Sequence, residues 1–171
     1  EKTAVVKQLP IARRRWNLGI AAAIALLFLA GWWYTNDTNS TTQLVAAAPT
    51  ETVRHILPDQ SVVSLNAVSQ LTYDEQNWQQ QRSLELKGEA FFEVQKGEKF
   101  QVYTSLGTIE VLGTSFNVEE RNGQLTVHCY TGSVRVSVNN GESVVLQPNE
   151  AASWAGKKLQ KFSATNELDI A

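Results

Sequence analysis

Two patterns of hydrophobic and polar residues divide this chain. Residues Trp16 to Tyr34 form one apolar run without a charged side chain, which is typical of a membrane-spanning helix. From Arg54 onward, short segments rich in valine, threonine, leucine and aromatic residues alternate with turn signals. This second pattern recurs about every eight to twelve residues and lacks helical periodicity, so it predicts an antiparallel all-β domain.

The predicted strands are delimited mainly by their turns. Asn122-Gly123 and Asn140-Gly141 each lie between two apolar runs, and Asn-Gly favours the positive φ angles of a tight hairpin. In Ser133–Val138 the valines would face a core and the polar residues would face water. We therefore expect a sandwich or jelly-roll-like domain, with a short open barrel as a further closure. The predicted strands are Val62–Leu65, Leu71–Tyr73, Ser83–Leu86, Ala90–Val94, Phe100–Thr104, Thr108–Leu112, Phe116–Glu120, Leu125–Tyr130, Ser133–Val138, Ser143–Leu146, Ala152–Trp154 and Leu159–Phe162.

The apolar run fits a single membrane anchor. A helix over residues 16–34 would span about 28 Å, close to the thickness of the hydrocarbon core of a bilayer. Three arginines precede the run and none follows before Arg54, so the positive-inside rule places the N-terminus in the cytoplasm. A cleaved signal peptide is the alternative, but its apolar part is usually shorter. The predicted anchor residues are Arg13, Arg14 and Arg15 before the run and Trp16, Trp32 and Trp33 at its aromatic ends.

These patterns divide the chain into segments of different character. Residues 1–15 would be a cytoplasmic juxtamembrane segment and 16–34 the transmembrane helix. Residues 35–53 are polar, small and nearly unpatterned, which predicts a linker on the far side of the membrane. The all-β domain would occupy 54–165, and 166–171 would form a tail.

The amino-acid composition argues against several kinds of binding site. The net charge of −2 and the pI near 5.7 give no basic face for nucleic acid. Cys129 is the single cysteine, so it forms no intramolecular disulfide and is expected to be a small buried apolar group. His55 and His128 have no other ligand at metal-binding spacing. We therefore predict no metal and no cofactor.

The segment Gly88–Val94 contains the sharpest candidate for a site. Glu89 and Glu93 suggest a glycosidase pair, but on a strand they would lie about 13 Å apart, which exceeds the separation such enzymes use. Alternation instead points both carboxylates and Phe91 away from the core. An outward aromatic side chain between two carboxylates is a candidate contact with a partner protein. We therefore predict a contact site at Phe91, Glu89 and Glu93, and no catalytic residue.

Several motifs in order resemble the periplasmic domain of FecR-family transmembrane sigma-factor regulators, which are anti-sigma factors. Gln60 and Asn149 stand where the family motifs usually have glycine. The matching segments are Leu57–Asn66 (Leu-Pro-Asp-Gly-Ser-x-Val-x-Leu-Asn), Leu86–Val94 (Gly-Glu-Ala-Phe-Phe-Glu-Val), Val111–Val118 (Val-Leu-Gly-Thr-x-Phe-Asn-Val), Gly132-Ser133-Val134 and Leu146–Glu150.

The resemblance implies a signal relay. In this family a loaded TonB-dependent outer-membrane transporter contacts the periplasmic part, and a cytoplasmic region then releases or activates an extracytoplasmic-function sigma factor. The resemblance thus implies a single-pass protein of the bacterial inner membrane with its bulk in the periplasm. Members commonly continue into a small C-terminal periplasmic domain, so the tail 166–171 is expected to lead toward one.

Two other functions share this topology. A membrane-anchored β-jelly roll for lipid or lipopolysaccharide transport would need an apolar groove between its sheets. A tethered glycan-binding domain would need Trp78, Trp154 and an acidic pair to converge on one exposed cleft.

Overall fold

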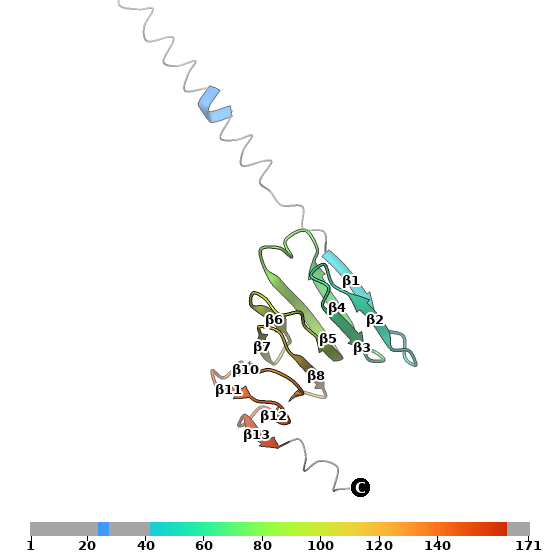
Figure 1. Ribbon diagram of the computed structural model, residues 1–171, viewed down its shortest axis with the longest axis vertical. Helices are drawn as coiled ribbons and strands as arrows, with labels where there is room; N and C mark the ends of the chain where they lie inside the picture. Colours follow the sequence, from blue (N-terminus) through green and yellow to red (C-terminus); the bar gives the residue numbers. More distant parts are fainter. Residues whose placement is uncertain (1–23, 28–41, 164–171) are drawn as a thin grey trace, which may run out of the picture. The chain divides into compact units, whose positions relative to one another are not determined.

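The computed structural model of the protein describes residues 24–27 and 42–163 (Figure 1). Residues 24–27 are helical and lie within the predicted anchor. Across these described ranges, no helix has the length and apolar character needed to cross a membrane. The other predicted features of the N-terminal region lie outside the described residues, as does the tail 166–171. They are the segment 1–15, the rest of the anchor, and Arg13, Arg14, Arg15, Trp16, Trp32 and Trp33.

Residues 42–163 form a 13-stranded sheet, which confirms the predicted all-β class. The strands fall into two groups that share the long strand β5 (Arg82–Glu93). Sheet A has the order β1-β4-β5-β6-β7-β10-β11, with β1 at Thr42–Ala46, β4 at Gln70–Asp74, β6 at Phe100–Tyr103, β7 at Gly107–Val111, β10 at Val134–Val138 and β11 at Ser143–Leu146. Sheet B has the order β2-β3-β5-β8-β9-β12-β13, with β2 at Val53–Ile56, β3 at Val62–Leu65, β8 at Ser115–Arg121, β9 at Gln124–Cys129, β12 at Glu150–Trp154 and β13 at Gln160–Ser163.

Strand β5 belongs to both sheets because it changes partners at Gly88. Residues before Gly88 pair with β4 and β6, whereas residues from Gly88 onward pair with β3 and β8. Gly88 has a φ of 95°, in a region that favours glycine. The end of β5 thereby lies near its beginning, and Arg82 Nη2 donates a hydrogen bond to the Gln95 carbonyl at 2.9 Å.

The pairing of β5 with β6 corrects the prediction of a purely antiparallel domain. Arg82–Glu85 pairs with Phe100–Tyr103 in parallel. A parallel pair normally needs a crossover of a dozen or more residues. Here residues 94–99 suffice, because the turned course of β5 has already brought the chain back. The prediction of separate strands at Ser83–Leu86 and Ala90–Val94 is wrong for the same reason, since β5 continues through Gly88.

The folded domain also begins earlier than the sequence pattern indicates. Strand β1 lies within the predicted linker 35–53, and its residues Thr42–Ala46 pair with Gln70–Asp74 of β4. It is a short edge strand in which even Val45 is only half-buried. An edge strand with little buried surface gives a weak hydrophobic pattern, so its sequence reads as a spacer.

The interior is filled by large side chains from both sheets. Phe92 of β5 stacks on Phe116 of β8 at a centroid distance of 4.9 Å and meets Phe100 of β6 edge-on at 6.3 Å. Trp78, from the loop before β5, packs edge-on against Phe100 at 5.7 Å. The valines of β10 face this interior, as their alternation predicts. Full burial of such side chains contributes about 1.5–3 kcal/mol each to folding.

The sheet is nearly closed, like a barrel, and does not split into a sandwich of two separate layers. The end strand of sheet A at β11 and the end strand of sheet B at β13 approach one another along a line that we call the seam. There Lys161 Nζ donates to the Val145 carbonyl at 3.0 Å, and Leu159 N donates to Glu142 Oε2 at 2.8 Å. Side-chain hydrogen bonds therefore bridge the seam where a backbone ladder would complete a barrel.

Candidate functional site

The predicted contact residues lie on the outer face of sheet B. Ala90 and Phe92 of β5 are fully buried, so the alternating residues between and beside them point outward. Phe91 is half-buried and Glu93 is exposed. Strand alternation therefore places Glu89, Phe91 and Glu93 on one outer face, as the sequence predicts.

Phe91 is covered in part by an aromatic neighbour that sequence reasoning missed. The ring of Tyr130 meets it edge-on, with centroids 5.6 Å apart and an interplanar angle of 67°. Half of Tyr130 remains exposed. The two residues are far apart in sequence, and only the pairing of β5 with β8 and of β8 with β9 brings them together. The alternation of β9 alone gives no signal of this contact.

A row of side chains crosses sheet B at the level of Phe91. Successive strand pairings align Phe91 with Asn117, His128, Ala151 and Phe162. His128 and Phe162 meet edge-on at 6.4 Å. We call Phe91, Tyr130, His128 and Phe162 the outer aromatic patch. Aromatic side chains are enriched at protein interfaces, so this arrangement suits protein contact.

The two carboxylates beside Phe91 differ in their surroundings. Glu89 accepts hydrogen bonds from Asn66 Nδ2 at 2.6 Å and from Asn117 Nδ2 at 3.1 Å. These amides hold the Glu89 side chain in place, whereas Glu93 is exposed at the far end of β5. The patch thus has one fixed and one exposed carboxylate at its edge. This arrangement would favour a partner with a basic residue near an apolar one.

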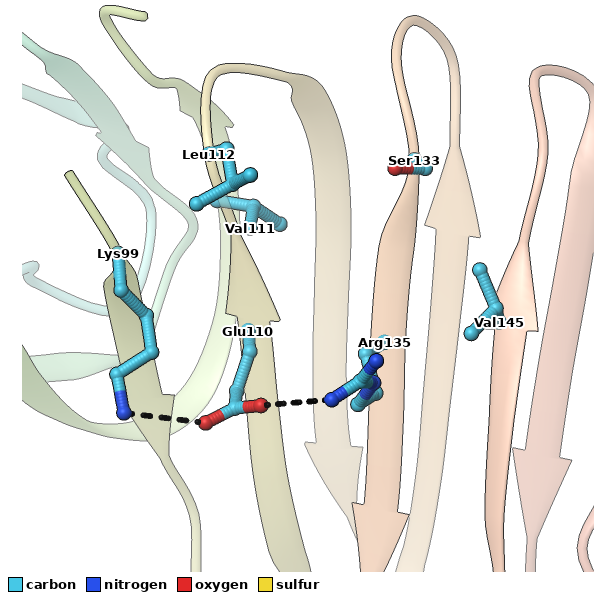
Figure 2. Close-up of a pocket in the computed structure, with 7 residues that line it drawn as sticks. All are labelled: Lys99, Glu110, Val111, Leu112, Ser133, Arg135 and Val145. Carbon is cyan, nitrogen blue, oxygen red and sulfur yellow. Dashed lines mark ion pairs between the residues drawn. The ribbon is translucent and has the colours of Figure 1, made fainter. Parts of the chain in front are cut away.

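A pocket of about 230 Å³ lies on sheet A (Figure 2). Glu110 of β7 sits between two cations, with Oε1 3.5 Å from Lys99 Nζ and Oε2 3.8 Å from Arg135 Nη1. Gln101 Nε2 also donates to Glu110 Oε1 at 2.9 Å. The remaining lining residues are Val111, Leu112, Ser133 and Val145. Sequence reasoning gave no sign of this pocket, because its members come from three strands and from residues next to strand ends that are far apart in the sequence.

A second pocket, of about 410 Å³, is lined in part by a nearly buried ion pair. Arg82 donates to Asp59 Oδ2 from Nε at 2.7 Å and from Nη2 at 2.5 Å, and its guanidinium lies 5.4 Å from the centre of the Phe100 ring. Asp59 also accepts from the Ser61 hydroxyl at 2.8 Å. These contacts tie the turn before β3 to the start of β5, so we assign the ion pair a structural role.

Other residues weighed from the sequence have ordinary structural surroundings. His55 Nε2 lies 2.8 Å from the Tyr73 hydroxyl, and burial raises the pKa of Tyr73. Burial also raises the pKa of the Cys129 thiol, which favours the uncharged form of this buried residue. Over residues 42–163, no three His, Cys, Asp or Glu side chains cluster closely enough to hold a metal ion. Trp78 is only 1% exposed, so its ring is not presented to a glycan.

Comparisons with known proteins agree with the motif pattern. The FecR protein family matches residues 43–135, from β1 into β10. Two crystal structures of a proposed anti-sigma factor from Parabacteroides distasonis ATCC 8503 are similar in fold. One, at 2.50 Å resolution, has 30% identity, a TM-score of 0.67 and coverage of 71% of this chain and 60% of its own. The other, at 1.65 Å, has 31% identity, a TM-score of 0.66 and coverage of 71% and 59%. The chain thus spans about three fifths of their length. Among curated proteins, no match is found.

Proposed function

The chain belongs to the FecR protein family, and from that premise we propose that it is a transmembrane anti-sigma factor that relays a signal to a sigma factor. The observation that carries this proposal is the match to residues 43–135, since it covers most of the folded domain and more than half of the chain. The likeness to a proposed anti-sigma factor at 30% and 31% identity supports the same role.

The proposed relay assigns a different task to each segment. Residues 16–34 would anchor the chain in the inner membrane, with the N-terminus in the cytoplasm and the β-domain in the periplasm. The absence of charge from the run and the arginines before it support this topology. A cytoplasmic region would bind an extracytoplasmic-function sigma factor. A helix in lipid transmits a movement well, because its backbone hydrogen bonds are satisfied internally.

The signal would enter through contact between the β-domain and the signalling domain of a TonB-dependent transporter. We assign this contact to the outer aromatic patch with Glu89 and Glu93 at its edge. Phe91 and Tyr130 are part-exposed rings that pack together, and the fixed carboxylate of Glu89 adds polar specificity. Such a mixture of aromatic area and ordered polar groups is typical of specific protein interfaces.

The two other functions have less support in this fold. Lipid transport needs an apolar groove, yet stacked aromatic rings fill the interior and both described pockets include charged residues. Glycan binding needs Trp78 and Trp154 in one exposed cleft, but Trp78 is buried in the core. The geometry therefore favours contact with proteins.

Co-purification tests the proposed partners. The full chain, extended by its native cytoplasmic region, would be purified in detergent with a sigma factor and a TonB-dependent transporter encoded beside it. We expect both proteins to be captured. Deletion of residues 42–163 should abolish capture of the transporter but leave capture of the sigma factor intact. A housekeeping sigma factor serves as the control for specificity. Capture of neither partner would contradict the proposal and would favour the lipid or glycan function.

A further inference from the structure

The pocket on sheet A carries an excess of positive charge. Lys99 and Arg135 share the single carboxylate of Glu110, at 3.5 and 3.8 Å. Both distances are longer than those of a well-formed charged hydrogen bond. The side chains of Lys99 and Arg135 are 58% and 61% exposed, and the pocket lining includes no second carboxylate. The pocket is therefore suited to an acidic group.

Apolar surface lies next to these cations. Leu112 is 62% exposed and Val145 is 42% exposed, although both line the pocket. Figure 2 shows Leu112 and Ser133 nearer the loop ends of the strands, with Glu110 and Arg135 farther along them. Strand register places Val145 in one row with Arg135 and Glu110, so the exposed apolar side chain beside this charged row is Leu112. An extended peptide crossing the strands between the row and Leu112 would point alternate side chains toward the cations and toward Leu112.

We propose that the segment of this chain that follows β13, Glu167-Leu168-Asp169-Ile170, docks in this pocket. Its sequence alternates acidic and aliphatic residues. In an extended conformation Glu167 and Asp169 would project to one side, toward the cations, while Leu168 and Ile170 would project to the other side, toward Leu112. Two carboxylates then meet the charge that Glu110 leaves uncompensated. The proposal does not depend on the identity of the signalling partners.

The end of β13 lies close to the pocket. Strand β13 ends at Ser163, and two residues earlier Lys161 Nζ bonds the carbonyl of Val145, which lines the pocket. Passing from β13 over β11 to β10 requires about 10 Å at ordinary strand spacing. The five residues from Ser163 to Leu168 reach about 17 Å when extended. The segment is therefore long enough to place Leu168 over the pocket.

Because the segment is covalently linked to the β-domain, even a weak contact is sufficient to keep it in the pocket. A short flexible linker gives the segment an effective concentration of millimolar order at the pocket. An interaction that would be weak between separate molecules is therefore populated within one chain. The same connection favours this segment over a free acidic peptide. Because part of the attraction is between exposed charges, high salt should weaken it.

Hydrogen exchange of the full chain in detergent micelles tests the docking. We expect amides of residues 166–170 to exchange about tenfold more slowly than in a free peptide of the same sequence. The double substitution Lys99→Glu with Arg135→Glu should remove this protection. Adding Glu167→Lys and Asp169→Lys to that variant should restore it, because the charges are then exchanged between pocket and segment.

Matched controls separate docking from loss of fold. Lys87→Glu reverses a 67% exposed cation elsewhere on sheet A and should leave the segment protected. Exchange of core amides in β7 and β10 should be the same in all variants. Free-peptide exchange rates in the unsubstituted chain would overturn the proposal, as would protection that survives the reversal at Lys99 and Arg135. Protection that rises with protein concentration would assign the segment to a second copy and would also overturn it.

Discussion

At the scale of single residues, Gln60 and Asn149 show how this chain departs from its family. Both stand where the family motifs usually have glycine, and both adopt left-handed backbone angles, with φ of 66° and 64°. Asparagine tolerates this region, whereas glutamine gains nothing there. The turn at Gln60 is nevertheless held by the Gln60 N–H to the Leu57 carbonyl at 2.9 Å. Neighbouring hydrogen bonds thus maintain a conformation that the residue itself disfavours.

Gln60→Gly should therefore stabilise the domain. Glycine removes the steric cost of the left-handed angle, and we expect a gain of about 0.5–1 kcal/mol in the free energy of unfolding. Urea denaturation measures this gain. Gln81→Gly is the control, because Gln81 is not among the residues with positive φ, and it should destabilise the domain. A loss of stability in Gln60→Gly would show that the Gln60 side chain contributes more than its backbone costs.

Arg82→Met should be strongly destabilising. The substitution leaves Asp59 as an uncompensated charge in a site where its side chain is only 15% exposed. Removal of one partner from such a pair costs about 3 kcal/mol or more. Addition of Asp59→Asn should recover part of the loss, because the charge is then removed as well. Lys87→Met, at an exposed pair, should cost less than about 0.5 kcal/mol. Equal effects of Arg82→Met and Lys87→Met in urea denaturation would contradict the structural role of Arg82.

At the scale of elements, local patterns predicted most strands but missed how β5 is used. The valine alternation of β10 and the two Asn-Gly hairpins are local features, and the structure has β8–β9 and β10–β11 as antiparallel pairs around them. The turned course of β5 is not local, since it depends on contacts of Gly88 with the distant turn that contains Ser69. Strand β1 was missed because it buries little surface at a sheet edge.

Gly88→Ala tests the turned course of β5. An added Cβ would lie 2.8 Å from Ser69 Cβ and 3.0 Å from Ser69 Cα, and the φ of 95° would itself be strained. We expect a loss of about 3 kcal/mol in the free energy of unfolding. Gly123→Ala is the matched control, with a φ of 75° and no atom within 4 Å of its Cβ, so it should lose only about 1 kcal/mol. A Gly88→Ala domain as stable as the control would show that Ser69 moves away freely.

The link between β12 and β13 should depend on pH. A side-chain hydrogen bond from Lys161 and a backbone one from Gln147 lower the pKa of Glu150. Because the folded-state pKa is below the unfolded one, this stabilisation is present above about pH 4.3 and is lost as pH falls through the folded pKa. Carboxyl NMR titration should give Glu150 a midpoint below the usual glutamate value. Lys161→Gln should raise that midpoint, and an unchanged midpoint would exclude the lysine as its cause.

At the scale of the whole molecule, the sequence predicts the fold class but not how the sheet closes. Frequent turns and period-two alternation were sufficient to predict an all-β domain. Closure into a nearly complete barrel depends on the strand order and on the seam bonds of Lys161 and Glu142. These bonds join β13 and the residue before it to β11 and the residue before it. The candidate site shows the same division. Phe91 could be selected from its strand alone, whereas its contact with Tyr130 required the sheet.

The measurement that tests the central claim most directly is sigma-factor-dependent reporter transcription in cells that carry Phe91→Ala in the full-length protein. Truncation removes an aromatic side chain from the proposed contact face, so induction by the transporter's ligand should fall at least about fivefold. Thermal unfolding should show that the variant remains folded. Tyr103→Ala, which removes a 38% exposed aromatic side chain from sheet A, should leave induction unchanged. Full induction in a folded Phe91→Ala protein would contradict the account, and an unfolded variant would show that Phe91 is a structural residue instead.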